Sequence, residues 1–274
     1  MRVLFKDVSS ISEITKQINK FKSDTYQMNM TPDDAIYISS DFPLNHFYVK
    51  VGAIGNIEDS DMSIEYWSNL GWVPVANLND YTYSFAESGF VEFTPNKDES
   101  WLREDTNSQG SLIADLESIK IYDQHWIKIT FSQTLTQDIE LEWIGNKFSD
   151  DYDLFSEYPI FNDETFLTSY EAGKTTWEEQ HVKAAELIIQ DLKRKNIILG
   201  AEQILDREIL MPAAVSKVAE IIFNAFGNDY RQQRDDAKLE YAKRIDLSKF
   251  VIDTNGNAIK DHSDVVATQG WLSR

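Results

Sequence analysis

Carboxylates and histidines are the side chains in this sequence that could do chemistry. The chain has 46 Asp and Glu residues, 4 histidines and no cysteine. The lack of cysteine excludes disulfides, thiol catalysis and cysteine metal sites, and it fits synthesis in a reducing cytoplasm. No two histidines are spaced as metal ligands on a helix. His125 falls in an alternating apolar pattern and His181 in a helical apolar stripe, so we expect core or interface histidines rather than ligands.

Two acidic spacings bear on cation binding. Asp253-x-Asn255-Gly256 resembles the opening of a calcium loop, but a further Asp or Asn before the glycine and a closing Glu are missing. A type I′ Asn-Gly turn, closing a hairpin across Val251–Ile259, is therefore favoured. Asp150-Asp151-x-Asp153 is interpreted as a solvated acidic loop, with a weak divalent site as the alternative. We predict no metal site.

Enzymatic chemistry is not indicated elsewhere. Among so many acids, carboxylate pairs of the glycosidase kind arise by chance, and none is singled out. The sequence has no dinucleotide fingerprint, phosphate loop or Gly-x-Ser-x-Gly elbow. The many Trp and Tyr residues of the β domain could stack on sugars, but we expect Trp126 and Trp143 to fill the core of the sandwich. The prediction is a protein without catalytic residues or a bound cofactor.

The charge is unevenly distributed. The net charge is −20, and residues 31–170 hold 26 acidic and 6 basic side chains. Such a surface repels phosphates, so specific nucleic-acid binding is disfavoured. No apolar run is long enough to span a bilayer, and Met1–Ser10 lacks the apolar core of a signal peptide. We expect no membrane association.

The hydrophobic pattern changes along the chain. Residues 1–30 suggest a short strand and then a helix over Ser10–Lys22, where Ser10 and Glu13 have capping-box spacing. From 31 to 160, short alternating segments such as His125–Thr130 predict an antiparallel sandwich. Residues 161–174 are expected to be a connector laid against the protein.

The region 175–274 is predicted to be helical. Thr176 and Glu179 have capping-box spacing before an apolar stripe that ends near Leu192. A short helix, an apolar helix starting at Pro212 and a polar helix over Asp229–Ile245 follow. The predicted class is α+β, an N-terminal β-sandwich-like domain followed by a C-terminal four-helix bundle with a β-hairpin.

Two parts of the chain resemble proteins of tailed bacteriophages. Residues 60–145, with YWSNLGWVPV, DYTYSFAESGFVEFTP and HWIKIT, resemble β-sandwich modules of phage structural proteins. The C-terminal unit resembles the head-tail connector (adaptor, head-completion) family in the order of its elements. These are Ala184–Leu192, Gln203–Leu210, Ala214–Phe223, Tyr230–Tyr241 and Asp253–Gly256. Family members are often small and mostly helical, so the β domain in front is a departure whose role the resemblance leaves open.

The resemblance implies a virion structural protein of the neck, made in the host bacterial cytoplasm. Such a protein forms a ring of about twelve copies beneath the portal protein. The ring extends the DNA channel, contacts DNA without specific binding, and docks a stopper or tail-terminator protein. The alternative is a tail or baseplate protein whose β-sandwich binds a neighbour or a host glycan.

Two sets of residues are the candidate contact sites. The polar last helix is the predicted subunit interface, through Tyr230, Arg231, Arg234, Tyr241 and Arg244. The C-terminal tail is the predicted docking arm for the portal, through Val265, Val266, Trp271 and Leu272.

Overall fold

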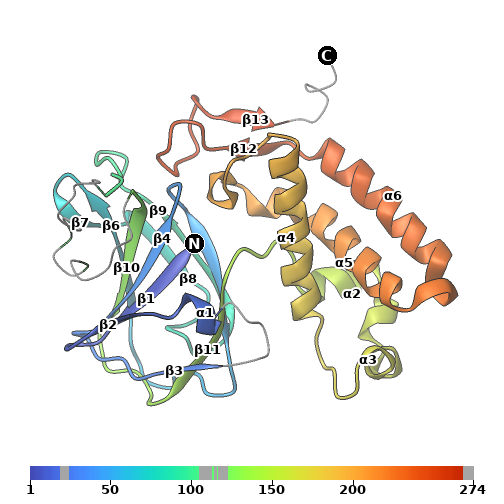
Figure 1. The fold of residues 1–274 in the computed structure, drawn as a ribbon, viewed down its shortest axis with the longest axis horizontal. Coiled ribbons are helices and arrows are strands. Elements are labelled where there is room, and N and C mark those ends of the chain that lie inside the picture. Colours follow the sequence, from blue (N-terminus) through green and yellow to red (C-terminus); the bar gives the residue numbers. More distant parts are fainter. Residues whose placement is uncertain (19–24, 105–112, 114–115, 117–122, 268–274) are drawn as a thin grey trace. The chain divides into compact units, whose positions relative to one another are not determined.

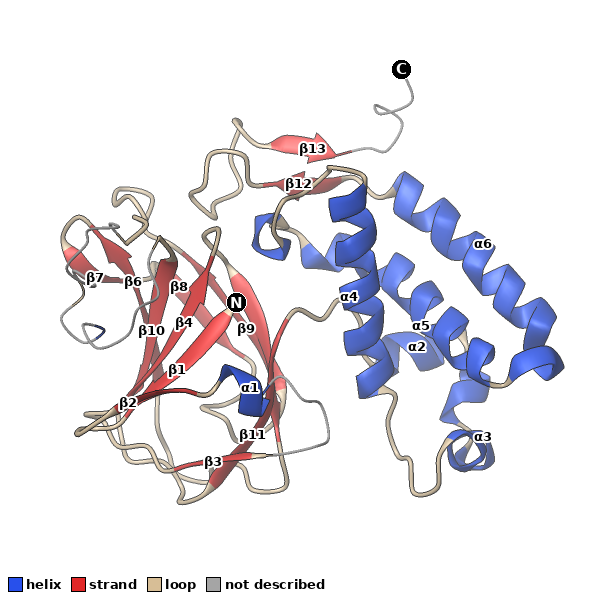
Figure 2. Cartoon of the chain, viewed as in Figure 1, coloured by secondary structure: helices blue, strands red, loops and turns tan. Residues whose placement is uncertain are grey.

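The computed structural model describes residues 1–18, 25–104, 113, 116 and 123–267 of the 274 residues (Figure 1). They divide into two compact units, and each is described by itself. The first comprises Met1–Gly145 and Asn255–Asp261, and the second Asn146–Thr254 and His262–Arg274. Strands dominate the first unit and helices the second, which confirms the predicted α+β class (Figure 2). None of the described helices combines the length and the apolar character that crossing a membrane requires.

The first unit contains two antiparallel sheets. The first sheet has the order β2-β1-β4-β10-β6-β7. Its strands are β1 (Arg2–Lys6), β2 (Ile11–Glu13), β4 (Ala35–Ser40), β6 (Met62–Ser68), β7 (Gly71–Pro74) and β10 (His125–Phe131). The second has the order β3-β11-β5-β9-β8. Its strands are β3 (Tyr26–Met28), β5 (His46–Val51), β8 (Asn77–Asp80), β9 (Gly89–Thr94) and β11 (Ile139–Gly145).

Alternation along the strands explains the core. In β10, Ile127, Ile129 and Phe131 are buried in one cluster with residues of both sheets, such as Phe47 and Leu141. Side chains on successive residues of a strand point to opposite faces, so one apolar set fills the space between the sheets.

The two tryptophans expected in that core are buried elsewhere. Trp126 belongs to a separate cluster with Leu4 and Tyr37, and its indole N–H donates to Glu104 Oε2 at 2.9 Å. Trp143 lies beside Tyr48, with ring centroids 6.1 Å apart. The register of β11 shifts between Leu141 and Trp143, and a single-residue shift reverses which face a side chain occupies.

The N-terminal segment differs from its prediction. The helix expected over Ser10–Lys22 is replaced by β2 and a short α1 (Thr15–Ile18), and residues 19–24 lie outside the described part. Asp7 competes with the capping box, because its carboxylate accepts from the backbone N–H groups of Ser9 and Ser10. That turn directs Ile11–Glu13 back along β1, so residues 1–18 join the first sheet rather than forming a separate segment.

The described part of the second unit contains a helix in each segment where one was predicted, and further short helices before and between them. These elements are α2 (Asp151–Glu157), η2 (Pro159–Asn162), α3 (Glu164–Tyr170), α4 (Glu178–Arg194), η3 (Ala201–Gln203), η4 (Arg207–Leu210), α5 (Met211–Ala225), η5 (Gly227–Tyr230) and α6 (Arg231–Leu247). The predicted connector, residues 161–174, contains the end of η2 and all of α3, and α2 lies at the end of the segment 31–160 that was predicted to be β-sandwich. Asp150 and Asp163 explain why, since each carboxylate caps a helix by accepting a backbone N–H three residues on.

The C-terminal hairpin also differs from its prediction. Strand β12 (Phe250–Ile252) pairs with β13 (Val265–Ala267), so the loop between them is long and the expected Asn-Gly hairpin is wrong. Asn255 and Asn257 each accept a backbone N–H two residues ahead, and such Asx turns compete with a strand ladder.

Candidate functional site

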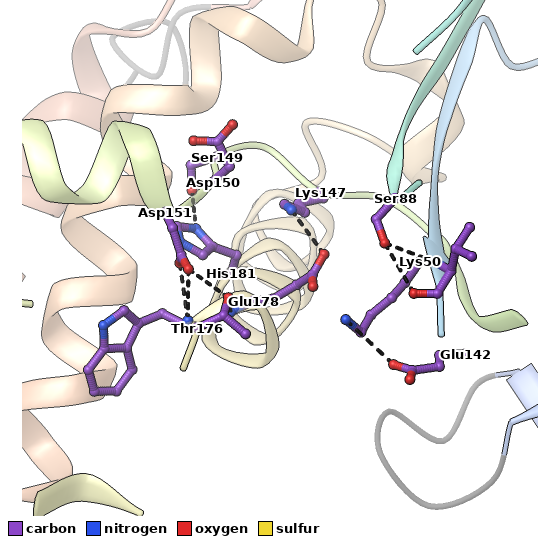
Figure 3. Close-up of polar contacts among 12 residues, drawn as sticks. Lys50, Ser88, Glu142, Lys147, Ser149, Asp150, Asp151, Thr176, Glu178 and His181 are labelled. Carbon is purple, nitrogen blue, oxygen red and sulfur yellow. Dashed lines mark hydrogen bonds and ion pairs between the residues drawn. The ribbon is translucent and has the colours of Figure 1, made fainter. Parts of the chain in front are cut away.

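Ser149, His181 and Asp151 form a hydrogen-bonded chain in the second unit (Figure 3). Ser149 Oγ lies 2.7 Å from His181 Nδ1, and His181 Nε2 lies 3.2 Å from Asp151 Oδ1. An ionised Asp151 can only accept, so Nε2 carries the ring proton and the Ser149 hydroxyl donates to Nδ1. The three residue types are those of a hydrolase triad, but the ring nitrogens have the opposite partners, because in the triad Nε2 faces the serine and Nδ1 faces the aspartate.

Local sequence positions the three side chains. Asp150 and Asp153 cap the start of α2 reciprocally, which fixes Ser149 just before the helix and Asp151 in its first turn. His181 lies in the first turns of α4, which starts without a side-chain cap of its own. The predicted Thr176–Glu179 capping box is therefore wrong. Instead Asp151 accepts from the Thr176 hydroxyl at 2.6 Å and from the Trp177 backbone N–H at 3.1 Å.

Burial sets the charge states. Burial lowers the pKa of the His181 imidazole, and the hydrogen bond and charge of Asp151, which raise it, offset this only in part. Burial raises the pKa of the Asp151 carboxyl, but hydrogen bonds from His181, Thr176 and Trp177 bring it below its ordinary value. The pair is thus a neutral imidazole beside a carboxylate.

These hydrogen bonds join the start of α2 to the start of α4, and the serine hydroxyl is inaccessible to substrates in this conformation. Ser149 is 3% exposed and His181 1% exposed, so a carbonyl group cannot approach the serine hydroxyl. The Asp151 carboxylate is used by Thr176 and Trp177 as well as by His181. We call Ser149, Asp151 and His181 the α2–α4 clamp, because they tie the start of one helix to the start of the other. The expectation of a solvated acidic loop at Asp150–Asp153 is wrong, since these carboxylates cap helices.

A buried ion pair lies on the same segment (Figure 3). Lys147 Nζ is 3.3 Å from Glu178 Oε1, and both side chains are largely buried. Burial lowers the pKa of the Lys147 ammonium, and the charge of Glu178 opposes this. A lysine buried beside a carboxylate positions the chain entering α2 against α4.

The other three histidines are not part of the clamp. His46 and His125 are buried in the first unit and His262 is exposed. Arg103 Nε donates to His125 Nε2 at 3.3 Å, and burial together with the Arg103 charge lowers the His125 pKa to about 4. Over the described residues, no group of three or more His, Cys, Asp or Glu side chains could hold a metal ion.

The first unit has a surface groove of about 750 Å³ between the loops Asn56–Met62 and Asp80–Ala86. Four carboxylates line it, those of Glu58, Asp59, Asp61 and Asp80. Ile57 and Tyr83 also line it and are 86% and 68% exposed. The groove combines acceptor groups with exposed apolar side chains.

The turn that bears Tyr83 has an unusual backbone. Tyr83, Ser84 and Phe85 have φ values of 51°, 56° and 67°, the left-handed region that side chains disfavour. Asp80 stabilises the turn by accepting the backbone N–H groups of Thr82 and Ser84.

Of the predicted interface residues, Tyr241 and Arg244 of α6 and Tyr230, the last residue of η5, make contacts within the chain. Tyr241 is buried, and its hydroxyl donates to Asp191 Oδ2 at 2.9 Å. Tyr230 stacks on Phe223 with centroids 5.6 Å apart. Arg244 pairs with Glu157 and Glu240 of the same chain.

The remaining predicted contact residues divide between surface, strand and the undescribed end. Arg231 is exposed and Arg234 is half-buried. Val265 and Val266 lie in β13, paired with β12, rather than in a free tail. Trp271 and Leu272 fall outside the described residues.

Comparison with known proteins gives no family for this chain. The sequence matches no protein-family model, and it matches no curated protein. The function is therefore argued from the chain's own residues and fold.

Proposed function

We propose that this chain is a virion structural protein of a tailed bacteriophage, a head-to-tail connector (adaptor) that docks on the portal protein. The observation that carries the proposal is the order of elements from Glu178 to Ala267. An amphipathic helix, a short helix, an apolar helix and a polar helix follow one another there, and the strand pair β12–β13 comes after them in place of the expected Asn-Gly hairpin. That order of helices is the one by which the sequence resembles the connector family.

Two physical features support a structural role over an enzymatic one. The residues that most resemble a catalytic triad are buried and used as the α2–α4 clamp. The acidic excess, within residues 31–170, disfavours adhesion to DNA, which suits a protein beside a channel through which DNA must pass. In this role the protein forms a ring, carries the channel onward and meets a stopper or tail-terminator protein.

The test uses the full chain and the portal protein of the same virus. Mixing the two should give a complex of fixed stoichiometry by native mass measurement, with a ring at one end of the portal by electron microscopy. A chain that ends at Ala267 tests the predicted docking role of Trp271 and Leu272, and it should bind portal more weakly. Absence of any complex between the full chain and its portal overturns the proposal.

A second candidate is a tail or baseplate protein whose β-sandwich binds a neighbour or a host glycan. The groove beside Tyr83 favours it, because carboxylates can accept sugar hydroxyls and an exposed tyrosine can stack on a sugar face. Glycan-array binding by the full chain, lost in Tyr83→Ala and kept in Tyr152→Ala, would select this role. Tyr152 is the matched control because it is exposed and lies in the other unit.

A further inference from the structure

The outward face of α6 is a single stripe of exposed side chains. It runs through Gln232, Asp235, Asp236, Leu239, Ala242, Lys243 and Asp246, all exposed. The inward face is formed by Ala237, Tyr241 and Ile245, which are buried. We call the exposed set the α6 stripe. It is distinct from the face that the sequence alone suggested as an interface.

Leu239 marks the middle of this stripe. It is 71% exposed, and α6 runs from Arg231 to Leu247, so Leu239 is its central residue. A helix of this length extends about 25 Å. A large apolar side chain at the centre of a polar helical face is the arrangement of an interface anchor surrounded by a polar rim.

Charges of opposite sign flank Leu239 on the stripe. Asp235 lies four residues before it and Lys243 four residues after it, while Asp236 and Asp246 add negative charge on either side. We propose that α6 binds α6 of a second copy of this chain in an antiparallel pair, about a two-fold axis that passes through Leu239. The α6 stripe of one copy thus packs against the α6 stripe of the other.

The register follows from the spacing. Asp235 and Lys243 each lie four residues from Leu239, which is about 6 Å along the helix axis. In an antiparallel pair, Asp235 of each copy therefore meets Lys243 of the other, twice by symmetry. Asp246, seven residues beyond Leu239, comes opposite Gln232 and near the long side chain of Arg231. A parallel pair would instead place Asp235 beside Asp235 and Lys243 beside Lys243, so the charges select the antiparallel arrangement.

Competing contacts within the chain are weak. Asp235 pairs with Arg234 at 2.8 Å and with Arg231 at 3.9 Å, and Lys243 pairs with Glu240 at 3.8 Å. All lie at the surface, where such pairs contribute about 0–1 kcal/mol and exchange readily. They do not prevent the same charges from meeting a second copy.

The geometry also sets how tight the contact is. One helix face against another buries less than a standard protein interface, so the pairing is weak, dependent on concentration and weakened by salt. An isologous contact closes after two subunits and differs from the head-to-tail contacts of a ring. The pairing is therefore independent of portal docking, and either can fail without the other.

The experiment is sedimentation equilibrium of the full chain from about 1 μM to 1 mM, a range that brackets weak association. We expect a monomer–dimer equilibrium. Leu239→Asp should raise the dissociation constant at least about tenfold, because it buries two carboxylates at the axis. Asp235→Lys and Lys243→Asp should each raise it about tenfold, since each turns two attractions into repulsions. The double variant D235K/K243D should restore it to within about threefold, because the swapped charges again meet opposite charges.

Glu208→Lys and Lys193→Asp are the matched controls, since both residues are exposed and lie off the stripe. They should leave the dissociation constant unchanged. A chain that stays monomeric at every concentration overturns the proposal, and a different protein would then be the partner that binds the stripe. A dimer indifferent to Leu239→Asp overturns it as well. A complex that needs Leu239 but is not restored by the double charge swap overturns the antiparallel register. Circular dichroism checks that each variant keeps its helices. If Leu239→Asp loses helical structure, the charge-swap variants alone test the proposal.

Discussion

Replacing Asp151 by alanine should destabilise the helical unit by about 3 kcal/mol. The substitution leaves the Trp177 backbone N–H and the His181 Nε2–H without their acceptor. Each unsatisfied buried donor costs about 1–3 kcal/mol, so the two together cost about 2–6 kcal/mol. The Asp151 side chain is 25% exposed, so water replaces part of the loss, and we take the lower part of the summed range.

The assay is urea unfolding followed by far-ultraviolet circular dichroism, which the helices dominate. Glu208→Ala, which removes an exposed carboxylate, is the control and should change stability by less than about 0.5 kcal/mol. The double variant D151A/H181F should lose clearly less than the two single losses added together, because both side chains belong to one clamp. A D151A protein as stable as the Glu208 variant would refute the clamp.

Three further predictions follow from other residues. His125 has a pKa lowered to about 4, so its contribution is complete above pH 6.5 and is lost as pH falls toward 4. The unfolding free energy should fall by about 3 kcal/mol over this pH range, and His125→Gln should remove that fall. The measurement is the urea midpoint as a function of pH, and a variant whose midpoint depends on pH as the original protein's does contradicts the prediction. Gly145→Ala should cost about 1–3 kcal/mol, because a Cβ there would lie 2.3 Å from the Trp143 ring, and adding Trp143→Phe should recover part of the loss in the same assay. Tyr83→Gly should raise the unfolding free energy by about 1 kcal/mol by relieving a left-handed φ of 51°, and a loss of stability would show that the Tyr83 side chain holds the turn.

Periodicity predicted the elements whose packing is local. Strand β10 covers the alternating segment that begins at His125. The apolar stripe through Ala184 and Leu192 became the buried face of α4. In each case one face of a regular element is apolar, which the sequence shows directly.

The sequence did not show contacts between distant residues. The clamp joins residues 149 and 151 to residue 181, and no local pattern encodes such a meeting. A partial signal was present, because Asp150-x-x-Asp153 has the spacing of a reciprocal cap, and a histidine on a buried stripe needs a polar partner. The inner face of α6 was misjudged for a related reason, since Tyr241 is buried against Asp191, which lies fifty residues earlier.

The most direct measurement for the proposed function is the native mass of the full chain mixed with the portal protein of its virus. The connector role predicts a discrete complex in which the chain's copy number matches the portal's symmetry, with a ring seen at the tail-facing end. A portal that keeps its own mass at every ratio of the two proteins would contradict it.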